Sequence, residues 1–198
     1  MFDRALLTPL RASGAWQRLE RDLAAGRLPA AALEMPDGLK GLFLWALHAH
    51  LGRPVLAVVS GDVQAARLAE DTALISGLPV RVFASRPLTL GQATAASRDL
   101  IGRRIATLGA AMMGEAAVTV ASVDALLPPL PPADIFRASC VTLEVGQRQS
   151  MEDLLSRLSW SGYVREVRVE GPGQFAVRGG IVDVYPVTDE DAVRVEFF

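Results

Sequence analysis

Residues 171–186 read GPGQFAVRGGIVDVYP, in which two alternating apolar runs flank a Gly179-Gly180 pair. This pattern predicts a tight β-hairpin whose two-residue turn needs positive φ. Pairing outward from the turn sets Arg178 opposite Ile181 and Gln174 opposite Tyr185. Because successive strand side chains point to opposite sides, one face is apolar and comprises Phe175, Val177, Val182 and Val184. The other face carries Gln174, Arg178, Asp183 and Tyr185, with Ala176 and Ile181 between them, and is more typical of a recognition surface than of a core.

The composition indicates a globular chain with no bias toward nucleic acid. Its 198 residues suffice for one large domain or for one domain plus a smaller one, and 51% of them are hydrophobic. There are 20 Lys and Arg residues against 22 Asp and Glu residues, so the formal net charge is -2. This charge gives no global attraction to DNA, RNA or an anionic membrane surface, and any nucleic-acid contact would have to be local.

The cysteine and histidine content argues against a disulfide framework and against a metal site. Cys140 is the single cysteine of the sequence, which fits a reducing cytoplasm. His48 and His50 lie two apart on a predicted helix and so point in different directions, which disfavours a metal pair. No signal peptide and no apolar stretch of bilayer length are present, so we expect a cytoplasmic protein with no membrane partner.

The first part of the chain alternates helices and strands at short spacing. A helix is predicted over residues 15–25 and a short strand over 31–35. Helices are then predicted over 42–51, 63–75 and 93–113, and strands over 54–59, 80–83 and 118–121, followed by a short helical turn that Ser122 and Asp124 are placed to cap. This alternation is typical of βαβ units and predicts an α/β domain with a parallel sheet over residues 1–127.

Residues 128–132, PPLPP, mark the predicted domain boundary, because proline neither donates to a ladder nor continues a helix. Residues 128–198 predict a small α+β domain with an antiparallel sheet. We expect a helix over 150–160 with a cap at Ser150, and strands at 139–145, near 167–170, and at 174–178, 181–185 and 193–198. The last strand has no turn or polar tail after it, so we expect the domain to be truncated at Phe198.

Residues 34–51 have the layout of a RecA-like, P-loop-type nucleotide site: strand, glycine-containing turn, helix. The turn includes Gly38, Lys40 and Gly41. A working loop needs a lysine after the last glycine, to reach the phosphates, and then a hydroxyl for magnesium. Here Lys40 precedes Gly41, and Leu42 stands where the hydroxyl is needed. The sequence therefore predicts a degenerate site without ATP hydrolysis, whose helix N-terminus keeps some capacity to attract an anion.

Several stretches resemble the bacterial transcription-repair coupling factors (the Mfd family) and their relative UvrB. The most specific is GQFAVRGGIVDVYP, and others in the same order are IATL (105–108), VTVASVDAL (118–126), LLSRLSWSGY (154–163) and VRVEFF (193–198). The resemblance covers most of the chain from about Gly38. The coupling factors are the nearer of the two, because UvrB keeps a working P-loop and tends to carry Gly-Asp at the hairpin turn.

The resemblance implies the amino-terminal UvrB-like module of a coupling factor, formed by its first α/β domain and its UvrA-binding domain. Such a module is non-catalytic and recruits UvrA to stalled RNA polymerase. Contacts with RNA polymerase and DNA, together with ATP and Mg binding, are expected in domains outside this chain.

The resemblance also implies a UvrA-binding set of Arg165, Arg178 and Tyr185. Strict alternation sets Arg165 in phase with Val167 and Val169, so it is expected at the mouth of its strand or beyond a bulge. UvrB has a further arginine at the position of Ala176. The alternative for Arg178 is a surface pair with Asp183 worth under about 1 kcal/mol.

Two other functions stay open at this point. One is a UvrB-like ATP-dependent DNA repair fragment, which the Lys40-Gly41-Leu42 sequence disfavours. The other is a DNA-binding domain, which the net charge of -2 disfavours.

Overall fold

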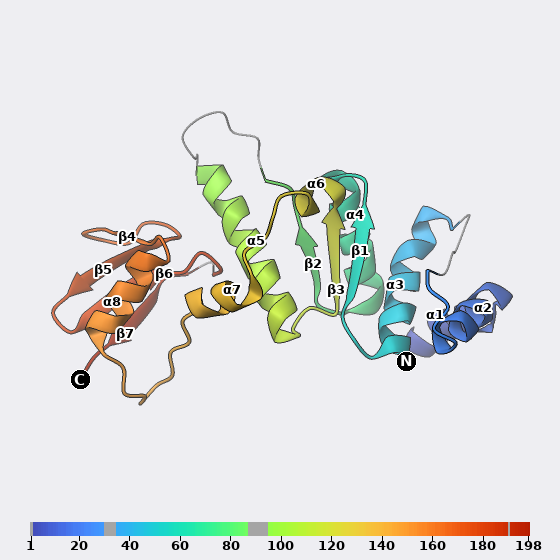
Figure 1. Ribbon diagram of the computed structural model, residues 1–198, viewed down its shortest axis with the longest axis horizontal. Coiled ribbons are helices and arrows are strands. Elements are labelled where there is room, and N and C mark those ends of the chain that lie inside the picture. Colours follow the sequence, from blue (N-terminus) through green and yellow to red (C-terminus); the bar gives the residue numbers. More distant parts are fainter. Residues whose placement is uncertain (1, 30–34, 87–94, 190) are drawn as a thin grey trace. The chain divides into compact units, whose positions relative to one another are not determined.

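The computed structural model describes residues 2–29, 35–86, 95–189 and 191–198 (Figure 1). The chain forms two compact units, Met1–Ser85 with Thr107–Leu127 and Arg86–Ala106 with Pro128–Phe198. The helix α5 (Ala95–Met113) therefore contributes to both. The division predicted at residue 128 stays a prediction, and the strand predicted over 31–35 lies almost wholly outside the described residues.

The first unit contains a parallel sheet, as predicted, in the order β1-β3-β2. Its strands are β1 (Val55–Val59), β2 (Val80–Phe83) and β3 (Val118–Ser122). One face packs against α3 (Asp37–Leu51) and α4 (Asp62–Ser76). The buried residues between them are Leu44, Val55, Ala65, Ala69, Val118 and Val120. The apolar runs of the strands are thus explained by helices that cover this face.

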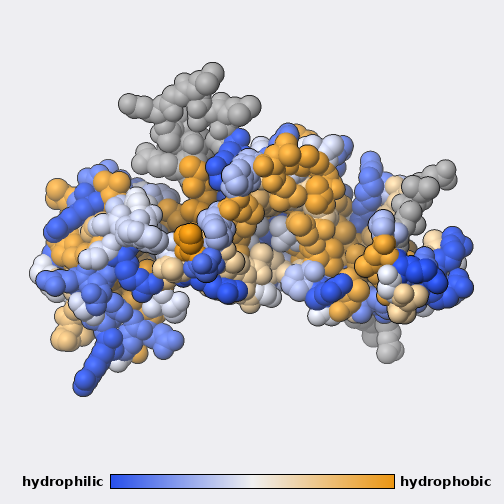
Figure 2. Space-filling model, viewed as in Figure 1, coloured by the Kyte–Doolittle hydropathy of each residue, from blue (hydrophilic) through white to orange (hydrophobic). Residues whose placement is uncertain are grey.

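On the other face of this sheet, Phe83 and Ala121 pack against Ala125 of α6 (Val123–Leu126). The Ser122 hydroxyl accepts a hydrogen bond from Ala125 N, so the predicted cap is confirmed. Leu56 and Val58 of β1 are 57% and 52% exposed. Figure 2 shows hydrophobic residues gathered on the visible surface over this sheet and α6.

Two helices form the amino-terminal part of the first unit. The predicted helix is present as α2 (Gly14–Ala24), with the Ser13 hydroxyl as its cap. Trp16 is 2% exposed and packs with Leu7 and Trp45. The helix α1 (Phe2–Ala12) was not predicted, because it carries Pro9 inside it and so lacks the usual signature of a helix.

The second unit contains a four-stranded sheet in the order β4-β5-β6-β7. Its strands are β4 (Val164–Arg165), β5 (Gln174–Arg178), β6 (Ile181–Tyr185) and β7 (Val193–Glu196). β5, β6 and β7 are antiparallel, but β4 runs parallel to β5, so the sheet is mixed and the prediction of an antiparallel sheet is wrong at this edge.

The strand predicted near 167–170 is also wrong. The backbone N–H groups of Glu170 and Gly171 donate to the side-chain oxygen of Gln174 at 2.7 and 3.0 Å. A side chain thus satisfies donors that a neighbouring strand would otherwise pair, and residues 166–173 form no strand.

The strand predicted over 139–145 is wrong: α7 (Ala133–Ser139) ends at its first residue, and residues 140–145 form neither helix nor strand. Pro132 precedes the helix with φ of -52°, which suits a helix start. The predicted helix follows as α8 (Met151–Trp160), and Asp153 N donates to the Ser150 hydroxyl, which confirms the cap. Leu154 and Leu158 of α8 pack on the apolar face of the sheet, against Phe175, Val182 and Val184.

Candidate functional site

The hairpin β5–β6 has the predicted register at all five pairs, from Arg178↔Ile181 to Gln174↔Tyr185. Gly179 has φ of +60°, a conformation that favours glycine. Gly180 does not have a positive φ, so only the first residue of the turn shows the predicted conformation. A Cβ at Gly180 would lie 3.0 Å from the carbonyl oxygen of Phe197, a tight contact. The turn therefore fixes both the hairpin register and the approach of the chain that follows β7.

The face of this sheet opposite α8 carries most of its polar side chains, and we call it the polar face. Paired residues on adjacent strands share a face. The register across β5, β6 and β7 therefore gathers Gln174, Ala176, Arg178, Ile181, Asp183, Tyr185, Arg194 and Glu196. Arg194 was not predicted as a site residue, although the alternation of Val193-Arg194-Val195-Glu196 contained the signal.

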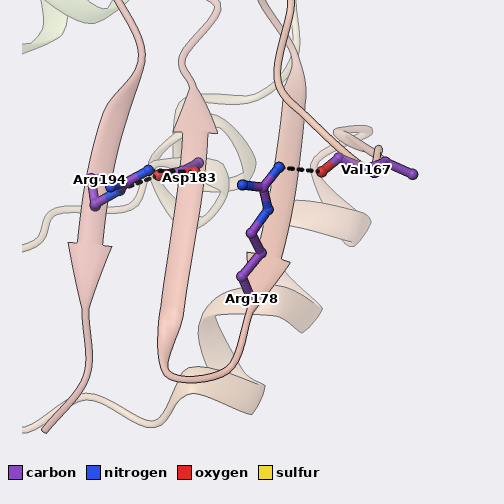
Figure 3. Close-up of polar contacts among 4 residues, drawn as sticks. All are labelled: Val167, Arg178, Asp183 and Arg194. Atoms are coloured by element: carbon purple, nitrogen blue, oxygen red, sulfur yellow. Dashed lines mark hydrogen bonds and ion pairs between the residues drawn. The ribbon is translucent and has the colours of Figure 1, made fainter.

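Asp183 and Arg194 form a two-pronged ion pair across β6 and β7 (Figure 3). Arg194 Nε donates to Oδ1 at 2.7 Å and Nη2 donates to Oδ2 at 3.0 Å. The hydrogen bond from Arg194 holds the pKa of Asp183 below its ordinary value, with a smaller contribution from the charge of Arg178. The surface pair considered for Arg178 and Asp183 is therefore not formed.

Arg178 instead donates from Nη2 to the carbonyl oxygen of Val167 at 3.2 Å (Figure 3). Val167 belongs to residues 166–171, which we call the strap because Gln174 and Arg178 both hold it against β5. Ala176 lies between these two residues on the same face and is 2% exposed. Ala176 is the position at which the resemblance places an arginine in UvrB.

A shallow groove on the polar face runs beside the strap. Its lining residues are Arg168, Val169, Arg178, Asp183, Ala192, Val193 and Arg194. The lining carries three guanidinium groups and one carboxylate, in a chain whose net charge is -2. Glu196 lies on the same face, and its charge also acts on Arg194.

The structure places two of the three predicted site residues on the polar face. Arg178 is exposed beside the turn, and Tyr185 is half-buried at the far end of the hairpin. Arg165 is exposed on β4 and pairs with Phe175, so its register assigns it to the opposite face. The prediction that it lies at the mouth of its strand fits the two-residue length of β4.

The predicted nucleotide loop has a different structure from the expected turn. α3 begins at Asp37, five residues before the predicted start, so Gly38, Lys40 and Gly41 all lie within a helix. Lys40 pairs with Asp37 at 2.6 Å. Gly41 allows close packing on α4, because a Cβ there would lie 3.1 Å from Thr72 N. The glycine here serves helix packing, and the acidic first turn disfavours an anion.

Asp62 lies at the carboxyl edge of the parallel sheet and joins the chain segments there by hydrogen bonds. Ligands bind at this edge in many open α/β folds. The Asp62 carboxylate accepts hydrogen bonds from Ser85 N at 3.1 Å and from the Ser85 and Ser122 hydroxyls, each at 2.5 Å. Asp62, the first residue of α4, thus joins Ser85, which follows β2, to Ser122 at the end of β3.

Histidines and acidic residues form no metal cluster within the described ranges. His48 Nδ1 lies 2.9 Å from the carbonyl oxygen of Arg53, and His50 pairs with Glu20 at 3.4 Å. Among the helices that the structure describes, none is long and apolar enough to cross a membrane.

Comparison with known proteins gives one family match and several relatives. Residues 141–198 match the family described as the UvrB interaction domain. The chain is 31% identical to the transcription-repair-coupling factor of Bacillus subtilis over 187 aligned residues. These residues make up 94% of this chain and 15% of that protein. It is 35% identical to the transcription-repair-coupling factor of Staphylococcus epidermidis and 33% identical to that of Staphylococcus aureus, each over 102 aligned residues. These residues make up 52% of this chain and 9% of each relative. The chain therefore spans a small part of the length of these relatives.

Proposed function

The chain is a homologue of the transcription-repair-coupling factors with a UvrB interaction domain at residues 141–198, and we propose that it is the UvrA-binding, amino-terminal module of such a factor. In this proposal it takes part in transcription-coupled nucleotide excision repair and recruits UvrA to stalled RNA polymerase. The module itself is non-catalytic and cytoplasmic. RNA polymerase, DNA, ATP and Mg²⁺ are bound by parts of the protein outside this chain.

The polar face of the four-stranded sheet is the observation that carries this proposal. The family match of residues 141–198 contains all four strands of the sheet and α8. α8 covers the apolar face, which leaves the polar face for a partner. Arginine and tyrosine are frequent hot spots of protein interfaces, and Arg178 and Tyr185 lie on this face in the hairpin whose sequence carries the resemblance.

The test is titration calorimetry of purified UvrA from the same bacterium with the 198-residue chain and its variants. We expect Arg178→Ala and Tyr185→Ala each to weaken binding by about 2 kcal/mol, roughly 30-fold, as for a typical hot spot. Arg165→Ala distinguishes two assignments of the site, because the resemblance includes Arg165 in the UvrA-binding set whereas the strand register puts it on the opposite face. Weaker binding of this variant would support the resemblance. Wild-type binding would support the assignment by register.

The matched control is Arg148→Ala, which removes the same charge from an exposed position ahead of α8. We expect it to leave the affinity unchanged. Wild-type affinity in both Arg178→Ala and Tyr185→Ala, with melting temperatures also unchanged, would overturn the assignment of the polar face.

A further inference from the structure

A ring of hydrogen bonds closes the end of the hairpin β5–β6 that lies away from its turn. Gly173 N donates to the carbonyl oxygen of Tyr185 at 2.8 Å, and the carbonyl oxygen of Gly173 accepts from Val164 N at 2.9 Å. The hydroxyl of Tyr163, the residue before Val164, accepts a hydrogen bond from Val187 N at 3.2 Å. Three hydrogen bonds thus tie together the start of β4, the turn before β5 and the chain that follows β6.

The sequence after β6 explains why a side chain has to supply this acceptor. Pro186 follows Tyr185 and has no backbone N–H. The N–H of Val187 is therefore the first donor after the strand, and the Tyr163 hydroxyl binds it. Val187 is half-buried, and a buried or half-buried donor that loses its partner costs free energy. The hydroxyl therefore determines where the chain runs directly after Tyr185.

The ring and the hydroxyl of Tyr163 have separate roles. The ring packs against the buried cluster that includes Leu158, Phe175 and Val184. Burial is the largest cause that raises the pKa of Tyr163 above its ordinary value of 10.0, so the hydroxyl is protonated and uncharged at neutral pH. Tyr163→Phe therefore removes the acceptor for Val187 N and leaves both the packing and the charge of the chain unchanged.

We propose that Tyr163 is a positioning residue of the docking surface, whose hydroxyl holds the chain behind Tyr185 and so fixes the ring of Tyr185 for binding to UvrA. This inference rests on the proposed function and adds to it a residue that packs against the core. The backbone of Tyr185 is held on two sides, by Gly173 at its carbonyl group and by Tyr163 two residues further on. An aromatic side chain that is already held in place loses less freedom when a partner binds.

Calorimetry with UvrA tests the proposal by comparing Tyr163→Phe with Ser150→Ala. Ser150 caps α8 by accepting a hydrogen bond from Asp153 N, and it takes no part in the ring of hydrogen bonds. Each substitution deletes one hydroxyl that accepts from a backbone N–H, so each should lower the melting temperature by about 2–4 °C. We expect Tyr163→Phe to weaken UvrA binding on the order of fivefold and Ser150→Ala to bind like the wild type. Equal affinities of the two variants would overturn the positioning role.

Double-mutant cycles show whether Tyr163 acts through Tyr185. If it does, the hydroxyl has no effect on binding once the ring of Tyr185 is gone, so Tyr163→Phe combined with Tyr185→Ala should bind like Tyr185→Ala alone. The loss should persist when Tyr163→Phe is combined with Arg178→Ala, because Arg178 lies beside the turn at the other end of the hairpin. Losses that multiply in the Tyr163–Tyr185 pair would contradict the proposal.

Amide hydrogen exchange measured by NMR tests the hydrogen bond itself. Exchange at Val187 should be faster in Tyr163→Phe, where the donor has lost its acceptor, and should stay at the wild-type rate in Ser150→Ala. Unchanged exchange at Val187 in Tyr163→Phe would show that the hydroxyl does not hold this segment.

The binding results separate this inference from the proposed function. If the wild-type chain does not bind UvrA, the proposed function fails and this inference falls with it. If Tyr185→Ala and Arg178→Ala weaken binding while Tyr163→Phe binds like the wild type, the inference fails and the proposed function stands.

Discussion

At the residue scale, Asp183 links the two arginines of the polar face. It is the acidic residue of a strand, β6, whose other face is buried against α8 by Val182 and Val184. Its carboxylate is engaged by Arg194 at both oxygens. Arg178 is thereby left to hold the strap through the Val167 carbonyl. Arg194 is therefore oriented by the carboxylate of Asp183, whereas Arg178 is oriented by a backbone carbonyl group.

The titration of Asp183 tests this arrangement directly. Its pKa is expected below the ordinary value of 3.8 in the wild-type chain, first because of the hydrogen bond from Arg194. Arg194→Ala should raise the pKa most of the way back, and Arg178→Ala should raise it less, since the charge of Arg178 contributes less. Carboxyl carbon NMR shifts measured against pH would show both changes.

The sign of the linked effect on stability follows from the same shift. A carboxyl group whose pKa is lowered by folding stabilises the folded state fully above its ordinary pKa. That contribution is lost as the pH falls below 3.8 and through the lowered value. Equal pKa values for Asp183 in the two arginine variants would contradict the assigned pairing.

At the element scale, the hairpin was predictable and the strap was not. Gly-Gly between alternating runs specifies both the turn and the face of every residue from 174 to 185, and the register confirms it. The strap depends on Gln174 and Arg178, which lie several residues further along the chain. Local alternation in 167–170 resembles a strand, but side-chain hydrogen bonds from Gln174 and Arg178 to the backbone of this segment take the place of strand pairing.

The start of the helix α3 was also not predictable from the local sequence. Gly38 and Gly41 suggested a loop, because glycine lowers helix propensity. The approach of Thr72 on α4 to Gly41 explains one of these glycines in physical terms. No feature within residues 36–41 indicates that Gly41 packs against Thr72, because this contact joins two helices that are distant in the sequence.

Alanine substitutions at these two glycines should therefore have opposite effects. A Cβ at Gly38 would meet nothing within 4 Å among the described residues, so Gly38→Ala should stabilise the chain by up to about 1 kcal/mol. A Cβ at Gly41 would lie 3.1 Å from Thr72 N and 3.2 Å from its Cα. Gly41→Ala should therefore destabilise the chain, by roughly 1–3 kcal/mol as in other overpacked interiors.

Urea unfolding of the two variants measures this difference, with Gly38→Ala as the matched control for helix propensity. A Gly41→Ala variant as stable as Gly38→Ala would mean that the α3–α4 contact is looser than the structure indicates.

At the scale of the whole molecule, the sequence correctly predicted two kinds of architecture in one chain. The parallel sheet of the first unit and the helix-covered sheet of the second follow from the spacing of apolar runs. The partnership of Asp183 with Arg194 could not be predicted before the register of β7 was known. Arg178 and Tyr185 were found because a hairpin determines its own faces, whereas Arg165 depends on the pairing of a two-residue edge strand.

We also expect that the chain does not bind ATP and that ATP does not change its thermal stability. Lys40 is paired with Asp37, Leu42 offers no hydroxyl for magnesium, and Asp62 bridges the carboxyl edge of the parallel sheet. A ligand present at 100 times its dissociation constant would stabilise the folded chain by about 2.7 kcal/mol. We therefore expect millimolar Mg²⁺ and ATP to leave the melting temperature unchanged, with UvrB as the positive control. A rise that grows with ATP concentration would instead support the UvrB-like, ATP-dependent alternative, because stabilisation by mass action requires a site in the folded state.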